Sequence, residues 1–208
     1  MMRFLFATLA SAVPAYIFGG INGAIITSRL FFRKDVRDYG SGNPGLTNFY
    51  RVFGKSGSLL VIVIDVFKTI APVIFGGWLF GKYFDMTLLG RAISGFFVMI
   101  GHCFPVFYKF RGGKGVMAAG AIIIVLDWRV AIIGWGSFII ITALTRYVSL
   151  GAMVGGASFP ISMLLLGLGG VWEITAMSMC SLLLIVRHEG NIRRLIRGEE
   201  SKFKFRKE

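Results

Sequence analysis

The chain has 208 residues, of which 55% are hydrophobic, and its mean hydropathy is +0.73. A soluble domain of this size cannot bury so much apolar surface, so the composition excludes an ordinary soluble protein and predicts an integral membrane protein. The formal net charge of +13 could suggest nucleic-acid binding. A basic groove has no place among apolar spans, however, so no nucleic acid is expected and the predicted partners are anionic lipid and phosphate substrates.

Apolar tracts separated by charged clusters predict one polytopic domain over residues 1–208, an all-α bundle of about seven transmembrane helices. The first tract, residues 4–27, begins like a signal peptide but has no cleavage site, so we expect an uncleaved span. Residues 29–57 form the longest polar, turn-rich loop. Further spans are predicted at residues 58–80, 92–108, 130–144, 148–168 and 171–186.

The tract at residues 115–126 is too short to cross about 30 Å of hydrocarbon as a regular helix, so it predicts a half-helix or a thinly crossing one. Five crossings, with the short middle stretches re-entrant, are therefore the alternative to seven. With seven crossings, eighteen Lys and Arg residues fall on the side of the C-terminal tail and four on the other side. The positive-inside rule then places the N-terminus outside and the C-terminus in the cytoplasm, and five crossings preserve that sidedness.

Two pairs of residues lie inside apolar tracts. Asp65 and Lys68 are three positions apart, so on a helix they can neutralise each other, with a structural or a functional role. Cys103 and Cys180 are expected to be buried, inert thiols. We infer from them no disulfide, no metal site and no nucleophile.

Three polar clusters fall on the predicted cytoplasmic side, and each has groups suited to phosphate. The first, residues 40–48, reads GSGNPGLTN and is followed by Arg51. Its glycines let several N–H groups turn toward one anion, while hydroxyl, amide and guanidinium groups add donors. Taken alone, this pattern also fits a simple turn-rich loop.

The second cluster, residues 101–115, reads GHCFPVFYKFRGGKG and places Lys114 at the start of an apolar helix. Free N–H groups and the helix dipole would add there to the ammonium charge. The spacing is not that of a Walker loop, and a basic loop anchored to lipid headgroups is the alternative.

The third cluster, residues 187–194, reads RHEGNIRR. On a helix His188 and Asn191 would share one face, although a His at a membrane exit can also be a solvated interfacial residue. Because three such clusters meet on one side of a small membrane protein, a phosphate site is favoured.

These motifs carry a family resemblance. The bacterial acyl-phosphate:glycerol-3-phosphate acyltransferases of phospholipid synthesis (PlsY type) have signatures that look like SGNxGATN with a following Arg, GHxFPVFxxFKGGKGVAT and RHRENIxRL. This chain resembles them in the same order with SGNPGLTNFYR, GHCFPVFYKFRGGKGVMA and RHEGNIRRL, and also in an Asp-x-x-Lys and an RYVSL segment. It departs from the pattern at Leu46, at Met117 and Ala118, and at Glu189 and Gly190, where Glu189 can replace the lost Glu as partner of a basic residue.

The resemblance implies a compact bundle of seven helices in the bacterial inner membrane, a cytoplasm-facing active site, and no metal or cofactor. It implies transfer of a fatty acyl group from acyl phosphate to the 1-position hydroxyl of glycerol 3-phosphate, giving lysophosphatidate and phosphate. The implied catalytic residues are Ser41, Arg51, Lys114, His188 and Asn191. The implied substrate-binding residues are Gly42, Asn43, Gly45, Thr47, Asn48, Gly112, Gly113, Gly115 and Ser149.

Acyl phosphate has an activated carbonyl, so the substrate hydroxyl can attack directly without a covalent enzyme nucleophile. We expect Lys114, Arg51 and the loop at 41–48 to hold two phosphates, and His188 to act first as a binder, with a general base as the alternative. Chain-length preference and oligomeric state stay open, a monomer being one option.

Two rivals belong to other classes: a transporter or channel for an organic phosphate, and a non-catalytic lipid-phosphate binder. The clusters lie at one surface and not at the midplane, which favours the enzyme over a transporter.

Overall fold

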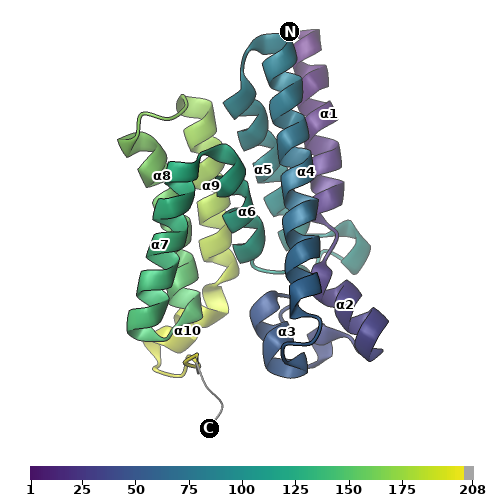
Figure 1. Ribbon diagram of the computed structural model, residues 1–208, viewed down its shortest axis with the longest axis vertical. Helices are drawn as coiled ribbons and strands as arrows, with labels where there is room; N and C mark the ends of the chain where they lie inside the picture. The colour runs from purple at the N-terminus through teal and green to yellow at the C-terminus, as the bar shows by residue number, and fades with distance from the viewer. Residues whose placement is uncertain (204–208) are drawn as a thin grey trace.

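The computed structural model describes residues 1–203, which contain helices and no β-strand. Five helical segments are long and apolar enough to cross a membrane, or six if the bent pair α9 and α10 forms one span. The predicted all-α integral membrane bundle is thereby confirmed. The N-terminus lies at one end of the bundle and α10 at the other (Figure 1). Which end faces the cytoplasm stays a prediction.

Three helices form one side of the bundle: α1 (Met2–Gly19), α4 (Ser58–Phe84) and α5 (Thr87–Cys103). Both α1 and α4 pack against α5, and glycines allow their backbones to come close. A Cβ added to Gly90 would lie only 2.2 Å from the carbonyl oxygen of Gly76, and one added to Gly101 would lie 2.1 Å from that of Tyr16. A larger residue at either glycine would therefore push these helices apart.

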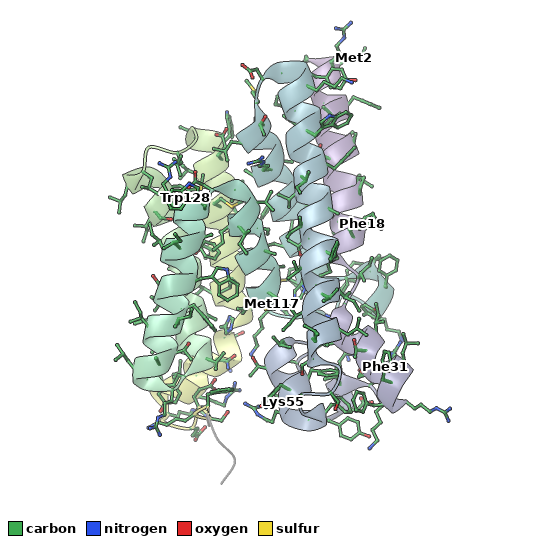
Figure 2. All side chains as sticks on the ribbon, in the orientation of Figure 1. Met2, Phe18, Phe31, Lys55, Met117 and Trp128 are labelled. Atoms are coloured by element: carbon green, nitrogen blue, oxygen red, sulfur yellow. The ribbon has the colours of Figure 1, made fainter. Side chains whose placement is uncertain are left out.

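Three more helices form the other side: α7 (Trp128–Thr145), α8 (Val148–Leu165) and α9 (Val171–Arg187). Between the two sides lies α6 (Val116–Leu126), which contacts α4, α5 and α7 (Figure 1). The label of Met117, at the start of α6, stands near mid-height of the bundle, well away from Lys55 at its end (Figure 2). The predicted short helix is confirmed, and its interpretation as a half-helix or a thinly crossing one stays a prediction.

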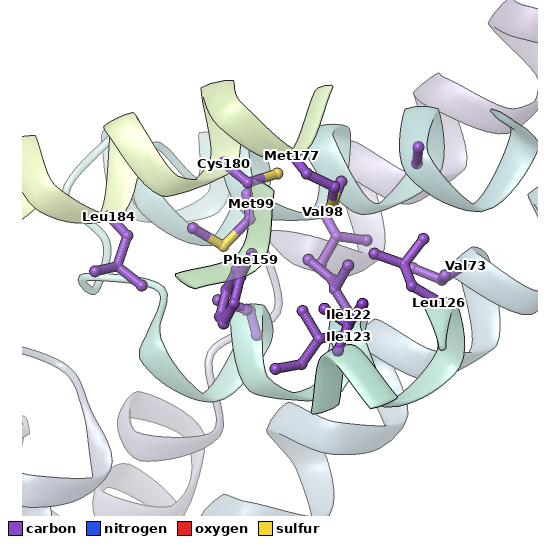
Figure 3. Close-up of a cluster of buried hydrophobic side chains, with 14 of the residues drawn as sticks. Val73, Val98, Met99, Ile122, Ile123, Leu126, Phe159, Met177, Cys180 and Leu184 are labelled. Atoms are coloured by element: carbon purple, nitrogen blue, oxygen red, sulfur yellow. The ribbon is translucent and has the colours of Figure 1, made fainter. Parts of the chain in front are cut away.

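The two sides are joined by a hydrophobic core around α6, shown in Figure 3. Its largest fully buried members are Met99, Ile122, Ile123, Met163, Met177 and Leu184. The two cysteines, Cys103 and Cys180, belong to this core and are free and buried, as predicted. Large apolar side chains such as Phe67 and Leu165 remain exposed on the outside, as expected where hydrocarbon replaces water as the solvent.

Short helices gather at the end of the bundle where α10 lies (Figure 1). They are α2 (Gly23–Phe32), α3 (Leu46–Phe53) and α10 (Glu189–Ile196). Two single-turn 3-10 helices, η1 (Val36–Asp38) and η2 (Val106–Tyr108), complete the helices of the described chain. The prediction that residues 29–57 form only a loop is therefore wrong. Phe49 of α3 is fully buried and belongs to a small core with Ile25 and Val61. That apolar contact is what stabilises a helix here.

Several predicted span boundaries also need correction. The first span is interrupted at residues 20–22, because the side chain of Asn22 accepts the N–H of Ile25 at 2.9 Å and starts a new helix. The third span begins at Thr87 instead of residue 92 and its helix ends at Cys103, two residues before Pro105.

The predicted pairing of Asp65 with Lys68 is confirmed. Their charged atoms lie 2.9 Å apart, and both side chains are at most 2% exposed. Lys68 also donates to the carbonyl of Ile21 and lies 2.9 Å from Nδ1 of His102, while Asp65 accepts the N–H of Gly23 at 3.1 Å. The pair thus satisfies the backbone groups left free by the break between α1 and α2, as membrane proteins require.

Candidate functional site

The loop that contains the first polar cluster is held in shape by Asn48, which is 2% exposed. Its amide nitrogen donates to the carbonyls of Val36 and Tyr39 at 3.2 and 3.0 Å, and its oxygen accepts the N–H of Ser41 at 2.9 Å. Gly40 has a φ of +60°, and a Cβ there would lie 2.4 Å from the Asn48 oxygen. The amide of Asn48 is therefore engaged in positioning Ser41.

The glycines of the second cluster have their backbone groups engaged inside the protein. The N–H of Gly112 donates to the carbonyl of Cys103 at 3.2 Å, and that of Gly113 to the carbonyl of His102 at 3.1 Å. Their own carbonyls accept the guanidinium of Arg187, at 3.0 Å for Gly112 and 3.2 Å for Gly113. These contacts fix the loop from which the next residue, Lys114, projects.

The third cluster lies where α9 bends by 56° into α10. Nδ1 of His188 lies 2.8 Å from the carbonyl of Leu184. A carbonyl can only accept a hydrogen bond, so Nδ1 carries the hydrogen and Nε2 is left as the acceptor in the neutral ring. One turn further, Oδ1 of Asn191 accepts a hydrogen bond from Lys114, which joins the second cluster to the third.

All three clusters meet at one cavity of about 270 Å³. The predicted site residues that line it are Ser41, Asn43, Gly45, Thr47, Asn48, Arg51, Lys114, Gly115, Ser149, His188 and Asn191. Gly42 and Gly112 line a neighbouring cavity instead. Gly113 is not among the lining residues, and its carbonyl accepts a hydrogen bond from Arg187. Residues far apart in the sequence are thus brought together as the phosphate-site prediction requires.

Three helices begin at this cavity with free backbone N–H groups. They are α3 after Gly45, α6 after Gly115 and α8 after Tyr147, and no side chain among residues 1–203 caps any of them. The first N–H groups of a helix and the positive end of its dipole favour an anion. The cavity therefore combines side-chain cations with backbone donors.

Positive charge predominates at the cavity. Arg51, Lys114 and Arg194 line it together with the carboxylates of Glu200 and Asp65, the latter already paired with Lys68. Burial, followed by the charge of Arg194, lowers the pKa of Lys114 to about 8, and the charge of Glu200 opposes this shift. At neutral pH the ammonium form still prevails, so the site can attract phosphate.

A second, wider cavity of about 870 Å³ adjoins the first and shares Ser41, Lys114 and Asn191 with it. Its lining includes the basic residues Arg29, Arg37, Lys109, Arg111, Arg187 and Arg194. Such a concentration of one charge raises the local concentration of anions. We call this cavity the basic vestibule.

Part of the wall of the first cavity is apolar and also borders a shallow groove between α6, α7 and α8. Val116, Trp135, Phe138 and Ala152 line both the cavity and the groove. Several glycines of these helices also border the groove, namely Gly120, Gly134, Gly155 and Gly156. The cationic cavity and the apolar groove, whose volume is only about 20 Å³, therefore share Val116, Trp135, Phe138 and Ala152 as a common wall.

Sequence reasoning missed several residues that line the cavity: Trp135, Phe138, Glu200, Ser201 and Phe203. It placed His102 and Arg194 in the polar clusters but did not name them as site residues. Glu200 lies in a charged tail whose composition gave no signal of a site. The departures Leu46 and Met117 also line the cavity. Glu189 pairs with Arg193 at the surface, as expected for a replacement partner. No group of His, Cys, Asp or Glu within residues 1–203 is arranged to hold a metal ion.

The chain is similar in sequence to known proteins. A family model described as "Glycerol-3-phosphate acyltransferase" matches residues 9–198. A glycerol-3-phosphate acyltransferase of Photobacterium profundum is 39% identical over 198 residues, which cover 91% of this chain and 90% of that protein. One of Thermoanaerobacter pseudethanolicus is 36% identical, covering 92% of this chain and 93% of its relative.

The fold is also similar to that of a solved enzyme. The crystal structure of PlsY, an integral membrane glycerol 3-phosphate acyltransferase, in its glycerol 3-phosphate form superposes with a TM-score of 0.84 at 31% identity, covering 95% of this chain and 96% of that one. The lysophosphatidic acid form superposes with a TM-score of 0.83 at 29% identity, covering 95% of both chains.

Proposed function

The chain belongs to the glycerol-3-phosphate acyltransferase family, and on that basis we propose that it moves a fatty acyl group from acyl phosphate to the 1-position hydroxyl of glycerol 3-phosphate. The proposed products are lysophosphatidate and phosphate, in the first acylation step of phospholipid synthesis. The observation that carries the proposal is the wall that the cationic cavity shares with the apolar groove. A donor with an anionic head and a hydrocarbon chain would place its phosphate in the cavity and the first part of its chain against that wall.

The acyl chain would lie in the groove along α6, α7 and α8, where Trp135 and Phe138 provide apolar contacts. Its phosphate would then reach the cavity, and glycerol 3-phosphate would arrive from water through the basic vestibule. Chemistry thus occurs at a water-filled boundary while the chain stays in an apolar environment. This division explains why such an enzyme is built into a membrane.

The reaction needs no covalent enzyme nucleophile, because phosphate activates the donor carbonyl. The hydroxyl oxygen of glycerol 3-phosphate attacks the carbonyl carbon, the bond from that carbon to the phosphate oxygen breaks, and phosphate leaves with the electron pair. The hydroxyl proton passes to a phosphate oxygen, with Nε2 of His188 as the alternative acceptor.

The proposed role of the protein is orientation and electrostatic stabilisation. Lys114 and Arg51 offset charge on the two phosphates, and the free ends of α3, α6 and α8 add backbone donors. Ser41 and Asn191 supply neutral polar groups. His188 is proposed as a binder first, because its Nε2 acceptor suits a glycerol hydroxyl.

The proposed location is the bacterial inner membrane, with one domain and the active site facing the cytoplasm. The support is the distribution of charge: the basic loop before α4, the vestibule and the tail after α9 gather at the same end of the bundle (Figure 1). The positive-inside rule predicts that this end is cytoplasmic.

The direct test uses the purified chain in detergent with acyl phosphate and glycerol 3-phosphate. Formation of lysophosphatidate together with equimolar phosphate is expected, and a Lys114→Ala variant serves as the negative control. The same assay with acyl thioesters as donors tests the choice of donor. Product from thioesters but not from acyl phosphate would refute the proposed donor.

The two rival functions give other outcomes. A transporter would accumulate glycerol 3-phosphate in vesicles that contain the protein without forming lysophosphatidate. A non-catalytic binder would retain lipid phosphate and form no product with either donor.

A further inference from the structure

The last described residues of the chain, Glu199 to Phe203, run along the cavity, and we refer to them as the strap. The hydroxyl of Ser201 lies 3.3 Å from the Arg51 guanidinium, and the N–H of Phe203 donates to the carbonyl of Arg146 at 2.7 Å. Glu200, Ser201 and Phe203 line the cavity. The strap therefore bridges α3 on one side of the bundle and the turn before α8 on the other.

Glu200 makes the most polar contacts of the strap. One carboxylate oxygen accepts the hydroxyl of Ser149 at 2.7 Å and the amide nitrogen of Asn191 at 2.6 Å. The other oxygen accepts Nε of Arg194 at 2.7 Å, and the side chain is only 7% exposed. A carboxylate with three donors converging on it is held in a defined position.

The contact with Asn191 decides which way that amide points. Because the nitrogen end donates to Glu200, the oxygen end must face the opposite way, where it accepts the ammonium of Lys114. Lys114 is thereby connected to Glu200 through a single side chain. Without the carboxylate the amide could rotate and present its nitrogen, a donor, to the ammonium.

The strap does not fill the site, because the cavity of about 270 Å³ remains open with Glu200 in its wall. Glu200 therefore acts as part of the wall and not as a plug in place of substrate.

We propose that Glu200 is a positioning residue for acyl transfer, which orients Asn191 and, through it, the ammonium of Lys114 that faces substrate phosphate. The proposal rests on the proposed function for its kinetic consequences. Glu200 itself does not need to touch the reacting atoms. Its carboxylate fixes the geometry of the groups that do.

The proposal has an electrostatic consequence that a purely structural strap would lack. The charged or titratable groups that act on Lys114 are Arg51 on α3, Arg187 on α9, His188 at the bend, Arg194 on α10 and Glu200 on the strap, whereas Asp65, which also lines the cavity, is paired with Lys68. Glu200 is the negative one among them, and it raises the pKa of Lys114 against the effects of burial and the arginines. Loss of this charge should let Lys114 lose its proton at a lower pH.

The experiment compares wild type with Glu200→Ala, Glu200→Gln and the matched control Glu199→Ala, which changes the exposed neighbour. We expect Glu200→Ala to lower kcat by about tenfold or more, with a smaller change in KM, because misplaced groups lose orientation. Glu200→Gln keeps an acceptor for Asn191 and should recover part of kcat. Both should move the alkaline fall of kcat/KM to lower pH, and Glu199→Ala should match wild type.

A binding measurement separates this proposal from the proposed function. Calorimetric titration of glycerol 3-phosphate into each variant, over a pH range around the Lys114 pKa of about 8, needs no acyl donor. If wild type fails to turn over acyl phosphate but Glu200→Gln still shifts the pH at which binding weakens, the proposed donor fails and the positioning role stands. If wild type is active and the Glu200 variants equal it in kcat and pH profile, the positioning role is refuted. A rise in kcat in either variant would also refute it, because the strap would then obstruct the site.

Discussion

Nη2 of Arg187 donates to the carbonyl of Gly112 at 3.0 Å, although the two residues are 75 positions apart in the chain. With the parallel contact to Gly113 at 3.2 Å, the end of α9 holds the loop that presents Lys114. Hydrogen bonds therefore connect the second and third sequence motifs before any substrate binds.

Replacement of Arg187 by Lys should lower kcat/KM by about tenfold or more. Hydrogen bonds from a charged donor contribute about 1.5–3 kcal/mol each, and a lysine keeps the charge but cannot reach both carbonyls with a planar fork. Steady-state kinetics in detergent would measure the loss, with the exposed Arg197→Lys as control. Unchanged kinetics in Arg187→Lys would show that the loop holds its shape without this contact.

The pH dependence of kcat/KM for glycerol 3-phosphate should report Lys114. Its pKa is lowered to about 8, mainly by burial, so the ammonium form prevails below that pH and is lost as the pH rises through it. We expect kcat/KM to fall above about pH 8. A Lys114→Arg variant, if active, should lack this fall because a guanidinium keeps its charge there. The same alkaline fall in Lys114→Arg would assign it to another group.

Replacement of Asp65 by Asn should destabilise the protein strongly. The substitution leaves the ammonium of Lys68 buried without its counter-charge, which costs about 3–5 kcal/mol in comparable pairs. Thermal unfolding in detergent should show a large loss of stability. Glu189→Gln, which breaks the exposed pair with Arg193, should change stability by less than about 1 kcal/mol. Adding Lys68→Met to Asp65→Asn should restore part of the loss, and equal stability of the Asp65 and Glu189 variants would contradict a structural role for the buried pair.

A larger side chain in the apolar groove should change donor preference. Ala152 borders both the cavity and the groove, so Ala152→Leu should raise KM for long-chain acyl phosphates more than for short-chain ones. KM for glycerol 3-phosphate should change little. The control is Ala143→Leu on the exposed surface of α7. An equal rise in KM for every chain length would place the acyl chain elsewhere.

Much of the fold could be predicted from the sequence because hydrophobicity and charge act locally. The apolar run that forms α6 is shorter than a regular membrane span. Asp65 and Lys68 are three positions apart, so they can pair on any helix. Helix ends were less predictable, since they depend on caps and contacts formed only in the fold. Asn22 interrupts the first span through a hydrogen bond to Ile25.

The candidate site was predictable where glycines and cations stand together in motifs, as around Lys114 and His188. The site was not predictable where a residue reaches it only because a distant segment of the chain folds against it. The amphipathic helix α3 was hidden in a polar segment, because the burial of Phe49 depends on Ile25 and Val61. Glu200 was hidden for a similar reason: its partners Ser149 and Asn191 approach it only after the strap has folded along the cavity.

The donors of the cavity are divided between the two halves of the bundle. Ser41 and Arg51 belong to the half with α1, α4 and α5, Ser149 and His188 to the half with α7, α8 and α9, and Lys114 lies on the connection between them. The site therefore lies at the junction of the two halves. Neither half carries all of these donors until the two halves have packed together. Turnover by a newly inserted chain therefore requires the last stage of assembly in the membrane. A chain arrested earlier would be inactive even if every helix had formed.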